Sequence, residues 1–219
     1  MKITAALVLV LVFLATAWVW AGAPAVANAS EPSSSLAQAD QKNAGAPAGP
    51  AETNYQSAQQ FIQAGNYEEA IIRLKTATSI KPDYLEAWAL LGSSQTKVKN
   101  LKEGIDAYER ALALSPGNAA YISAIAYNYR FLENWDKAEE YYTKLVEKDS
   151  LSYDGHVNLG FICERKDNPD QAIRHYEKAV AVQPADAATL HALAALYEKQ
   201  GKEAKSMECL QRAVAAAPD

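Results

Sequence analysis

Cysteine is scarce in this sequence. The 219 residues contain only Cys163 and Cys209. Two cysteines cannot form the disulfide framework of a small secreted domain. The repeat phase described below places them on helices that are separated by two others, whereas a bridge needs Cα atoms about 6 Å apart. We therefore interpret both as small hydrophobic residues of the core or surface.

Histidine is nearly as rare, and none of the three histidines occurs in a pattern typical of a catalytic site. His156 takes a bulky helix position and is expected to pack between helices. His175 is expected to point outward, and His191 toward an inner face. No serine-histidine-aspartate arrangement, metal-ligand cluster or phosphate-binding glycine loop can be assembled at these spacings. The sequence therefore predicts no catalytic residue, no metal, no cofactor and no enzyme activity.

Basic residues are in the minority, with 21 Lys and Arg against 26 Asp and Glu and a formal charge of −5. No basic stripe with interleaved aromatic residues is present, so there is no platform for capturing phosphates. A nucleic acid is therefore not the expected partner. About half of the residues are apolar, which is enough for a substantial core.

A 34-residue periodicity runs through the rest of the chain. Its closing prolines are Pro82, Pro116, Pro184 and Pro218, with Ser150 in the missing slot. Turn asparagines recur at Asn66, Asn100, Asn134 and Asn168, and we interpret them as left-handed residues that end a helix. Small residues fill two further slots of each unit: Ala58, Gly92, Ala126, Gly160 and Ala194, then Ala70, Gly104, Ala138, Ala172 and Ser206. Small residues at fixed spacing allow helix backbones to approach closely.

This pattern resembles a tetratricopeptide repeat (TPR), most clearly in residues 86–116. That stretch carries the signature residues Trp88, Leu91, Gly92, Gly104, Tyr108, Ala111 and Pro116. The resemblance implies an all-α fold, a right-handed superhelix of about five helix-turn-helix repeats over residues 51–219. The expected repeats are 51–84, 85–118, 119–152, 153–186 and 187–219. Each repeat buries its apolar face by stacking on its neighbours.

The N-terminal sequence is typical of an export signal. Residues 3–20 form an apolar run after Lys2. The small-x-small sequences that end at Ala27 and Ala29 favour cleavage and define a signal peptide over residues 1–27. Retention as a membrane anchor is favoured by the length of the run, because eighteen residues of helix span about 27 Å, nearly the thickness of the hydrocarbon layer of a membrane. Trp18 and Trp20 would then lie at the membrane–water interface. Both alternatives deliver the repeats across the cytoplasmic membrane, to a periplasmic or other extracytoplasmic location.

Residues 28–50 are rich in Ala, Pro and Ser and contain few large apolar residues. Such a segment cannot bury enough surface to offset the entropy of ordering, so we expect a disordered linker.

The resemblance also implies that a partner binds in the concave groove lined by the first helix of each repeat. The candidate groove residues are Tyr127, Arg130, Phe131, Val157, Asn158, Phe161 and His191. Tyr127, Phe131 and Phe161 could anchor an extended peptide or a partner helix, and Arg130 could hold a carboxylate. The alternative is that these aromatic residues pack sideways on adjacent helices. Some family members bind C-terminal carboxylates with a clamp of Lys, Asn and Arg side chains. In the last three repeats of this sequence, only Asn158 matches a residue of that clamp, so this mode of binding is not expected.

The sequence thus predicts a non-catalytic scaffold of the cell envelope that binds a protein or peptide. An alternative is a membrane-tethered assembly factor that docks through its convex or terminal surface. The last repeat leaves Met207, Leu210 and Val214 partly uncovered, which favours self-association or a further partner there.

Overall fold

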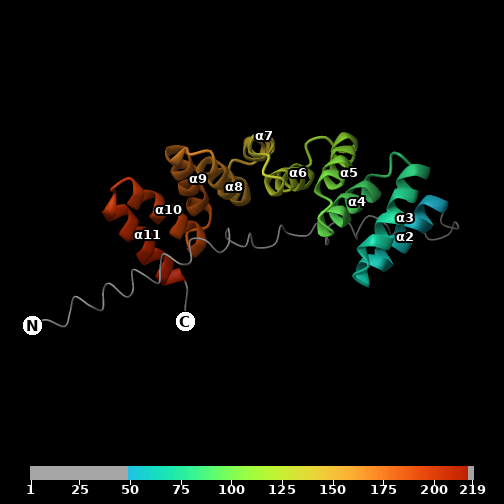
Figure 1. Ribbon diagram of the computed structural model, residues 1–219, viewed down its shortest axis with the longest axis horizontal. Coiled ribbons are helices and arrows are strands. Elements are labelled where there is room, and N and C mark those ends of the chain that lie inside the picture. Colours follow the sequence, from blue (N-terminus) through green and yellow to red (C-terminus); the bar gives the residue numbers. More distant parts are fainter. Residues whose placement is uncertain (1–48, 217–219) are drawn as a thin grey trace, which may run out of the picture. The chain divides into compact units, whose positions relative to one another are not determined.

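The computed structural model describes residues 49–216, which belong to one compact unit. In this range ten α-helices follow one another without a strand, and the chain alternates helix and short turn (Figure 1). The helices are α2 (Pro50–Gln63), α3 (Tyr67–Ile80), α4 (Leu85–Lys97), α5 (Leu101–Leu114), α6 (Ala119–Phe131), α7 (Trp135–Lys148), α8 (Tyr153–Arg165), α9 (Pro169–Val182), α10 (Ala187–Lys199) and α11 (Glu203–Ala216). The expected all-α solenoid is confirmed.

The core is distributed along the helices instead of being gathered at one centre. Each helix packs mainly on the helices before and after it in the chain. The buried residues accordingly form four clusters: one over α2 to α5, two over the middle helices, and one over α8 to α11. Cys163 and Cys209 are both unbridged and buried in the last of these, in agreement with their interpretation as small hydrophobic residues. A stack of this kind extends by adding pairs of helices.

Small residues permit the close contact within each helix pair. A Cβ atom added to Gly92 would lie 2.8 Å from the ring of Tyr108, and one added to Gly160 would lie 2.6 Å from the ring of Tyr176. Both distances are shorter than van der Waals contact. The glycines of α4 and α8 therefore make room for the tyrosines of α5 and α9.

The turn asparagines have a different role from the one expected of them. Asn66, Asn134 and Asn168 cap the second helix of each pair by accepting the backbone N–H of the residue three positions later. Their φ angles are negative, between −83° and −120°. The left-handed backbone belongs to the residue just before, such as Gly65 at φ 76° or Asp167 at φ 55°. The interpretation of the asparagines as left-handed residues was wrong, because all four have a negative φ and three of them serve as N-caps through their side chains. The fourth, Asn100, makes no such cap and donates instead to the side chain of Gln95.

One histidine also differs from expectation. His156 is buried between helices, as predicted, but His175 does not point outward. Its Nδ1 lies 3.1 Å from Nδ1 of His156, so the two rings join α8 to α9.

Between residues 49 and 216, no helix is both long and apolar enough to cross a membrane. The predicted export signal and almost all of the predicted linker lie outside the described residues.

Candidate protein-interaction site

Four aromatic side chains gather where α6, α7 and α8 meet. Tyr127 and Phe131 lie one turn apart on α6, with ring centroids separated by 4.5 Å. Trp135 opens α7, and its ring meets Phe161 of α8 edge to face at 6.0 Å. We call Tyr127, Phe131, Trp135 and Phe161 the aromatic cluster. The i, i+4 spacing along α6 and the tight turn before α7 place these rings together.

Arg130 joins the two halves of the aromatic cluster. Its Cζ lies 4.7 Å from the ring centroid of Phe131, 5.5 Å from that of Phe161 and 5.7 Å from that of Tyr127. A guanidinium over aromatic faces is a favourable cation-π arrangement. The side chain is only 8% exposed, so Arg130 does not stand open to solvent as a groove residue was expected to.

The residues of the aromatic cluster differ in how far they are exposed to solvent. Phe131 is 51% exposed, whereas Tyr127 and Phe161 are each partly covered by their neighbours. The sideways packing considered as an alternative therefore holds in part for Tyr127 and Phe161. Phe131 is the exposed member of the aromatic cluster.

The other expected groove residues fall outside the aromatic cluster. Val157 is buried in the core over α8 to α11. Asn158 is buried too, and its amide donates a 2.8 Å hydrogen bond to the carbonyl of Asp154 in its own helix. Neither side chain is open to a partner in this structure. His191 is exposed on α10, two helices beyond α8.

Sequence reasoning missed Trp135 as part of the site, because its repeat position suggested packing alone. The Trp135 ring also makes a cation-π contact with Arg165, whose Cζ lies 5.6 Å from the ring centroid. The available signal was the spacing: Trp135 follows Phe131 by four residues across the turn between α6 and α7.

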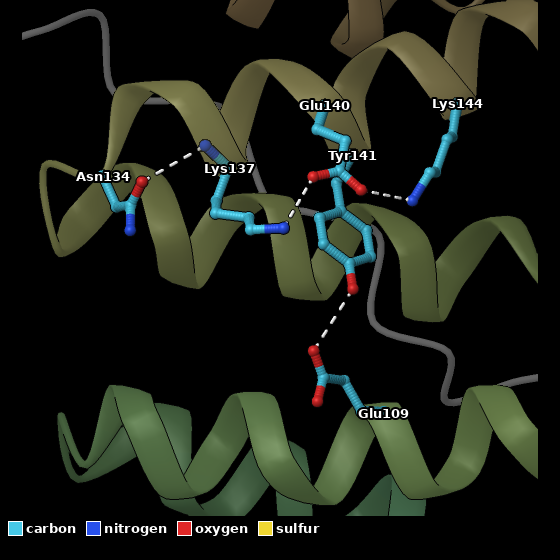
Figure 2. A network of polar contacts seen from close by, with 6 residues as sticks. All are labelled: Glu109, Asn134, Lys137, Glu140, Tyr141 and Lys144. Atoms are coloured by element: carbon cyan, nitrogen blue, oxygen red, sulfur yellow. Dashed lines mark hydrogen bonds and ion pairs between the residues drawn. The ribbon is translucent and has the colours of Figure 1, made fainter.

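A polar network on the second helices supports the same region (Figure 2). The Tyr141 hydroxyl donates to Glu109 of α5 over 3.2 Å, and its ring stacks on Tyr129 at 5.7 Å. Burial, and then the charge of Glu109, raise the pKa of Tyr141 to about 12, so it remains a hydrogen-bond donor. These contacts connect α5, α6 and α7.

The outer side of α7 carries ion pairs. Glu140 accepts hydrogen bonds from Lys137 at 2.8 Å and Lys144 at 2.7 Å, which lower the pKa of its carboxyl to about 2 (Figure 2). All three side chains are exposed, so the pairs contribute little to stability. Among the described residues, no group of three or more His, Cys, Asp or Glu is placed to bind a metal.

Comparison with protein families agrees with the helical pairs. Two family models, both described as tetratricopeptide repeat, match residues 55–119 and 150–219, which together make up more than half of the chain. The chain belongs to the TPR family.

Individual TPR relatives are distant. The peroxisomal targeting signal receptor of Saccharomyces cerevisiae is 23% identical over 192 residues, which covers 68% of this chain and 31% of the receptor. The type IV pilus assembly protein PilF of Pseudomonas aeruginosa is 30% identical over 126 residues, 55% of this chain and 48% of PilF. The chain thus spans about a third of the first relative and about half of the second.

Solved TPR structures share the fold. MamA from Desulfovibrio magneticus RS-1 superposes with a TM-score of 0.70 at 15% identity, covering 78% of this chain and 97% of MamA. YrrB, described as a TPR protein with an unusual peptide-binding site, gives 0.65 at 19% identity, covering 77% and 87%. Identities this low show the fold alone.

Two residues of opposite charge occupy the same position in successive repeats. Arg130 of α6 and Glu164 of α8 are 34 residues apart and occupy equivalent positions, as do Tyr142 and Tyr176 on the helices that follow. Tyr176 donates a 2.5 Å hydrogen bond to Glu164. Unit four therefore has a carboxylate where unit three has a guanidinium.

Proposed function

We propose that this TPR protein is a non-catalytic scaffold that binds a peptide or a partner helix on the face formed by the first helices of its repeats. The observation that carries the proposal is the half-exposed ring of Phe131, held against Tyr127 and Arg130 at the centre of the aromatic cluster. Helical repeat proteins bind partners on extended surfaces of stacked units. The structural likeness to YrrB and the similarity to a targeting-signal receptor support it.

Binding would use apolar burial for affinity and polar contacts for register. Covering the exposed half of a phenylalanine ring removes on the order of 100 Å² from water, which stabilises a complex by about 2 kcal/mol. An aromatic anchor in a well-supported setting is typical of an interaction hot spot. Tyr127 and Arg130 hold the Phe131 ring in place, and Arg130 in turn contacts the ring of Phe161.

Affinity capture tests this function. The tagged protein and its Phe131→Ala variant are used to retain partners from the native envelope, with Ile72→Ala as the matched control. Ile72 is 55% exposed on α3, away from the aromatic cluster. We expect one set of partners to be retained by the wild type and Ile72→Ala and at least tenfold less by Phe131→Ala. Equal retention by all three proteins would contradict the proposal.

We further propose that the protein is exported and works outside the cytoplasm. The apolar residues 3–20 after Lys2 support this, either as part of a cleaved signal peptide or as a retained anchor. N-terminal sequencing of the mature protein distinguishes cleavage near Ala27 or Ala29 from retention. Recovery of the intact chain in the cytosolic fraction would contradict export.

A second candidate function is docking into a larger envelope complex, or onto a second copy, through the terminal surface. Met207 is 57% exposed and Val214 72% exposed on α11, and Leu210 lies between them on the helix. Their spacing of three and four residues places them on one helical face. This apolar stripe favours a contact by the last repeat.

A further inference from the structure

Within residues 49–216, Arg130 is a buried cation that makes no ion pair. Among residues 49–216, the ion pairs within 4.0 Å join lysines to carboxylates of α7. The lysines are Lys137 and Lys144 of α7 and Lys166, which follows α8. None of them involves Arg130, although its side chain is only 8% exposed. A charge taken out of water is costly unless an opposite charge or hydrogen bonds compensate it.

The surroundings of Arg130 compensate its charge only in part. Three aromatic rings lie within 6 Å of its Cζ, which favours the guanidinium through cation-π attraction. Tyr142 of α7 is close enough for the positive charge to oppose the rise that burial causes in the tyrosine pKa. Within the described chain, however, the buried Nε of Arg130 has no hydrogen-bond acceptor. One donor on the guanidinium is therefore left without a partner.

The equivalent position of the next repeat holds a charge with more partners. Burial raises the pKa of Glu164, and the hydrogen bond from the Tyr176 hydroxyl at 2.5 Å and the charges of Lys199 and Arg165 offset this rise in part. The carboxylate on α8 thus has a hydrogen-bond donor and two cations near it. Within residues 49–216, Arg130 makes no ion pair with a carboxylate; Asp154 of α8 acts on Tyr142, the phenol near Arg130, and raises its pKa.

We propose that Arg130 pairs with a carboxylate of the bound polypeptide, while an apolar side chain next to that carboxylate packs on Phe131. This inference rests on the function proposed above and adds the chemistry of the ligand. The Arg130 Cζ lies 4.7 Å from the centroid of the half-exposed Phe131 ring, so a polypeptide that packs on this ring comes close to the guanidinium. The planar guanidinium suits a carboxylate better than a lysine would.

The carboxylate could belong to an acidic side chain or to the C-terminus of the partner. Four small probes separate these sources: N-acetylphenylalanine and its amide, and the dipeptide amides N-acetyl-Asp-Phe-NH₂ and N-acetyl-Asn-Phe-NH₂. Their affinities for the purified full chain are measured by NMR titration. We expect at least one acid to bind tenfold or more tightly than its neutral counterpart, and the acid that does so identifies the source. Such binding should weaken as salt is added.

Arginine variants decide whether Arg130 is responsible. Arg130→Leu should abolish the preference for the acid, and Arg130→Lys should retain part of it. Arg73→Leu is the control, because Arg73 is an exposed arginine of α3 and lies outside the aromatic cluster. It should leave the preference intact. If Arg130→Leu does not fold, as judged by circular dichroism, the Arg130→Lys variant and the salt dependence of the wild type still decide the outcome.

The inference is overturned if neutral probes bind as tightly as acids, if no acid binds, or if the preference survives in Arg130→Leu. Its failure is distinguishable from failure of the proposed function. Equal binding of acids and amides that is lost in Phe131→Ala would leave the apolar anchor in place and remove only the carboxylate.

Discussion

The Nδ1 atoms of His156 and His175 lie 3.1 Å apart and form one hydrogen bond between α8 and α9. Nε2 of His156 is also 3.1 Å from the carbonyl oxygen of Ser150 and donates its proton there. Nδ1 of His156 is therefore the acceptor, and His175 donates from Nδ1. Two imidazolium rings would place two donors face to face and remove this hydrogen bond.

Acid should destabilise the protein through this pair. Burial, followed by the nearby His156, Lys178 and Arg174, lowers the pKa of His175 to about 4, and Glu139 of α7 opposes the shift only weakly. A histidine of the unfolded chain has a pKa near 6.5. The unfolded chain thus binds more protons between these values, and stability that is complete above pH 6.5 is lost as the pH falls toward 4. Urea unfolding at pH 7 and pH 5 measures this loss.

Two variants assign the effect. His175→Gln retains a donor toward His156 but cannot titrate, so its stability should depend less on pH. His191→Gln, which changes an exposed histidine of α10, should behave like the wild type. The same pH dependence in all three proteins would contradict a role for the pair.

Gly92→Ala should destabilise the fold although alanine is the better helix former. Propensity alone would favour alanine by about 1 kcal/mol. The new Cβ would lie 2.8 Å from the ring of Tyr108, however, and overpacking of this kind costs about 1–3 kcal/mol. Tyr108 is buried and its nearest ring atoms include Cγ, so the ring cannot swing away. Chemical denaturation measures the sign of the change.

A double variant checks the cause. Tyr108→Leu removes the ring, and repeats one and five already combine alanine with leucine at these positions, as Ala58 with Leu74 and Ala194 with Leu210. Gly92→Ala should therefore cost less in the Tyr108→Leu background. A stabilising Gly92→Ala would show that the helices are not in this close contact.

Both cysteines should be unreactive in the native protein. Burial raises the thiol pKa of Cys163 and of Cys209, which reduces the thiolate fraction, and it also blocks access. Alkylation with iodoacetamide at pH 8, followed by mass spectrometry, should label neither residue before denaturation and both afterwards. A disulfide between Cys163 and Cys209, or rapid native labelling, would contradict the core packing of α8 to α11.

The apolar stripe on α11 should mediate self-association. Light scattering after size exclusion is expected to show a mass that rises with protein concentration, and Val214→Lys should reduce it to that of the monomer. Ile72→Lys, at a comparably exposed site on α3, serves as the control. A monomer at every concentration would refute this contact between copies.

The repeat phase was sufficient to predict the helices, the small residues at their contacts and the aromatic positions of α6 and α8. It could not predict how deeply neighbouring helices cover a side chain. Arg130, Val157 and Asn158 share the inner-face phase with Phe131, yet they are buried and Phe131 is not. Local hydrogen bonding was also invisible in the pattern. Three of the four turn asparagines cap helices through their side chains, whereas Asn100 does not, and His175 turns toward His156. Periodicity does not specify these partners.

Site-specific photo-crosslinking in intact cells that produce the protein tests the central claim most directly. A benzoylphenylalanine introduced in place of Phe131 lies at the proposed anchor, and one in place of Ile72 lies on a comparably exposed surface outside the aromatic cluster. We predict that light produces a discrete polypeptide adduct at position 131 and none of the same mass at position 72. Identical adducts at both positions, or none at position 131 in a folded protein, would contradict binding at the aromatic cluster.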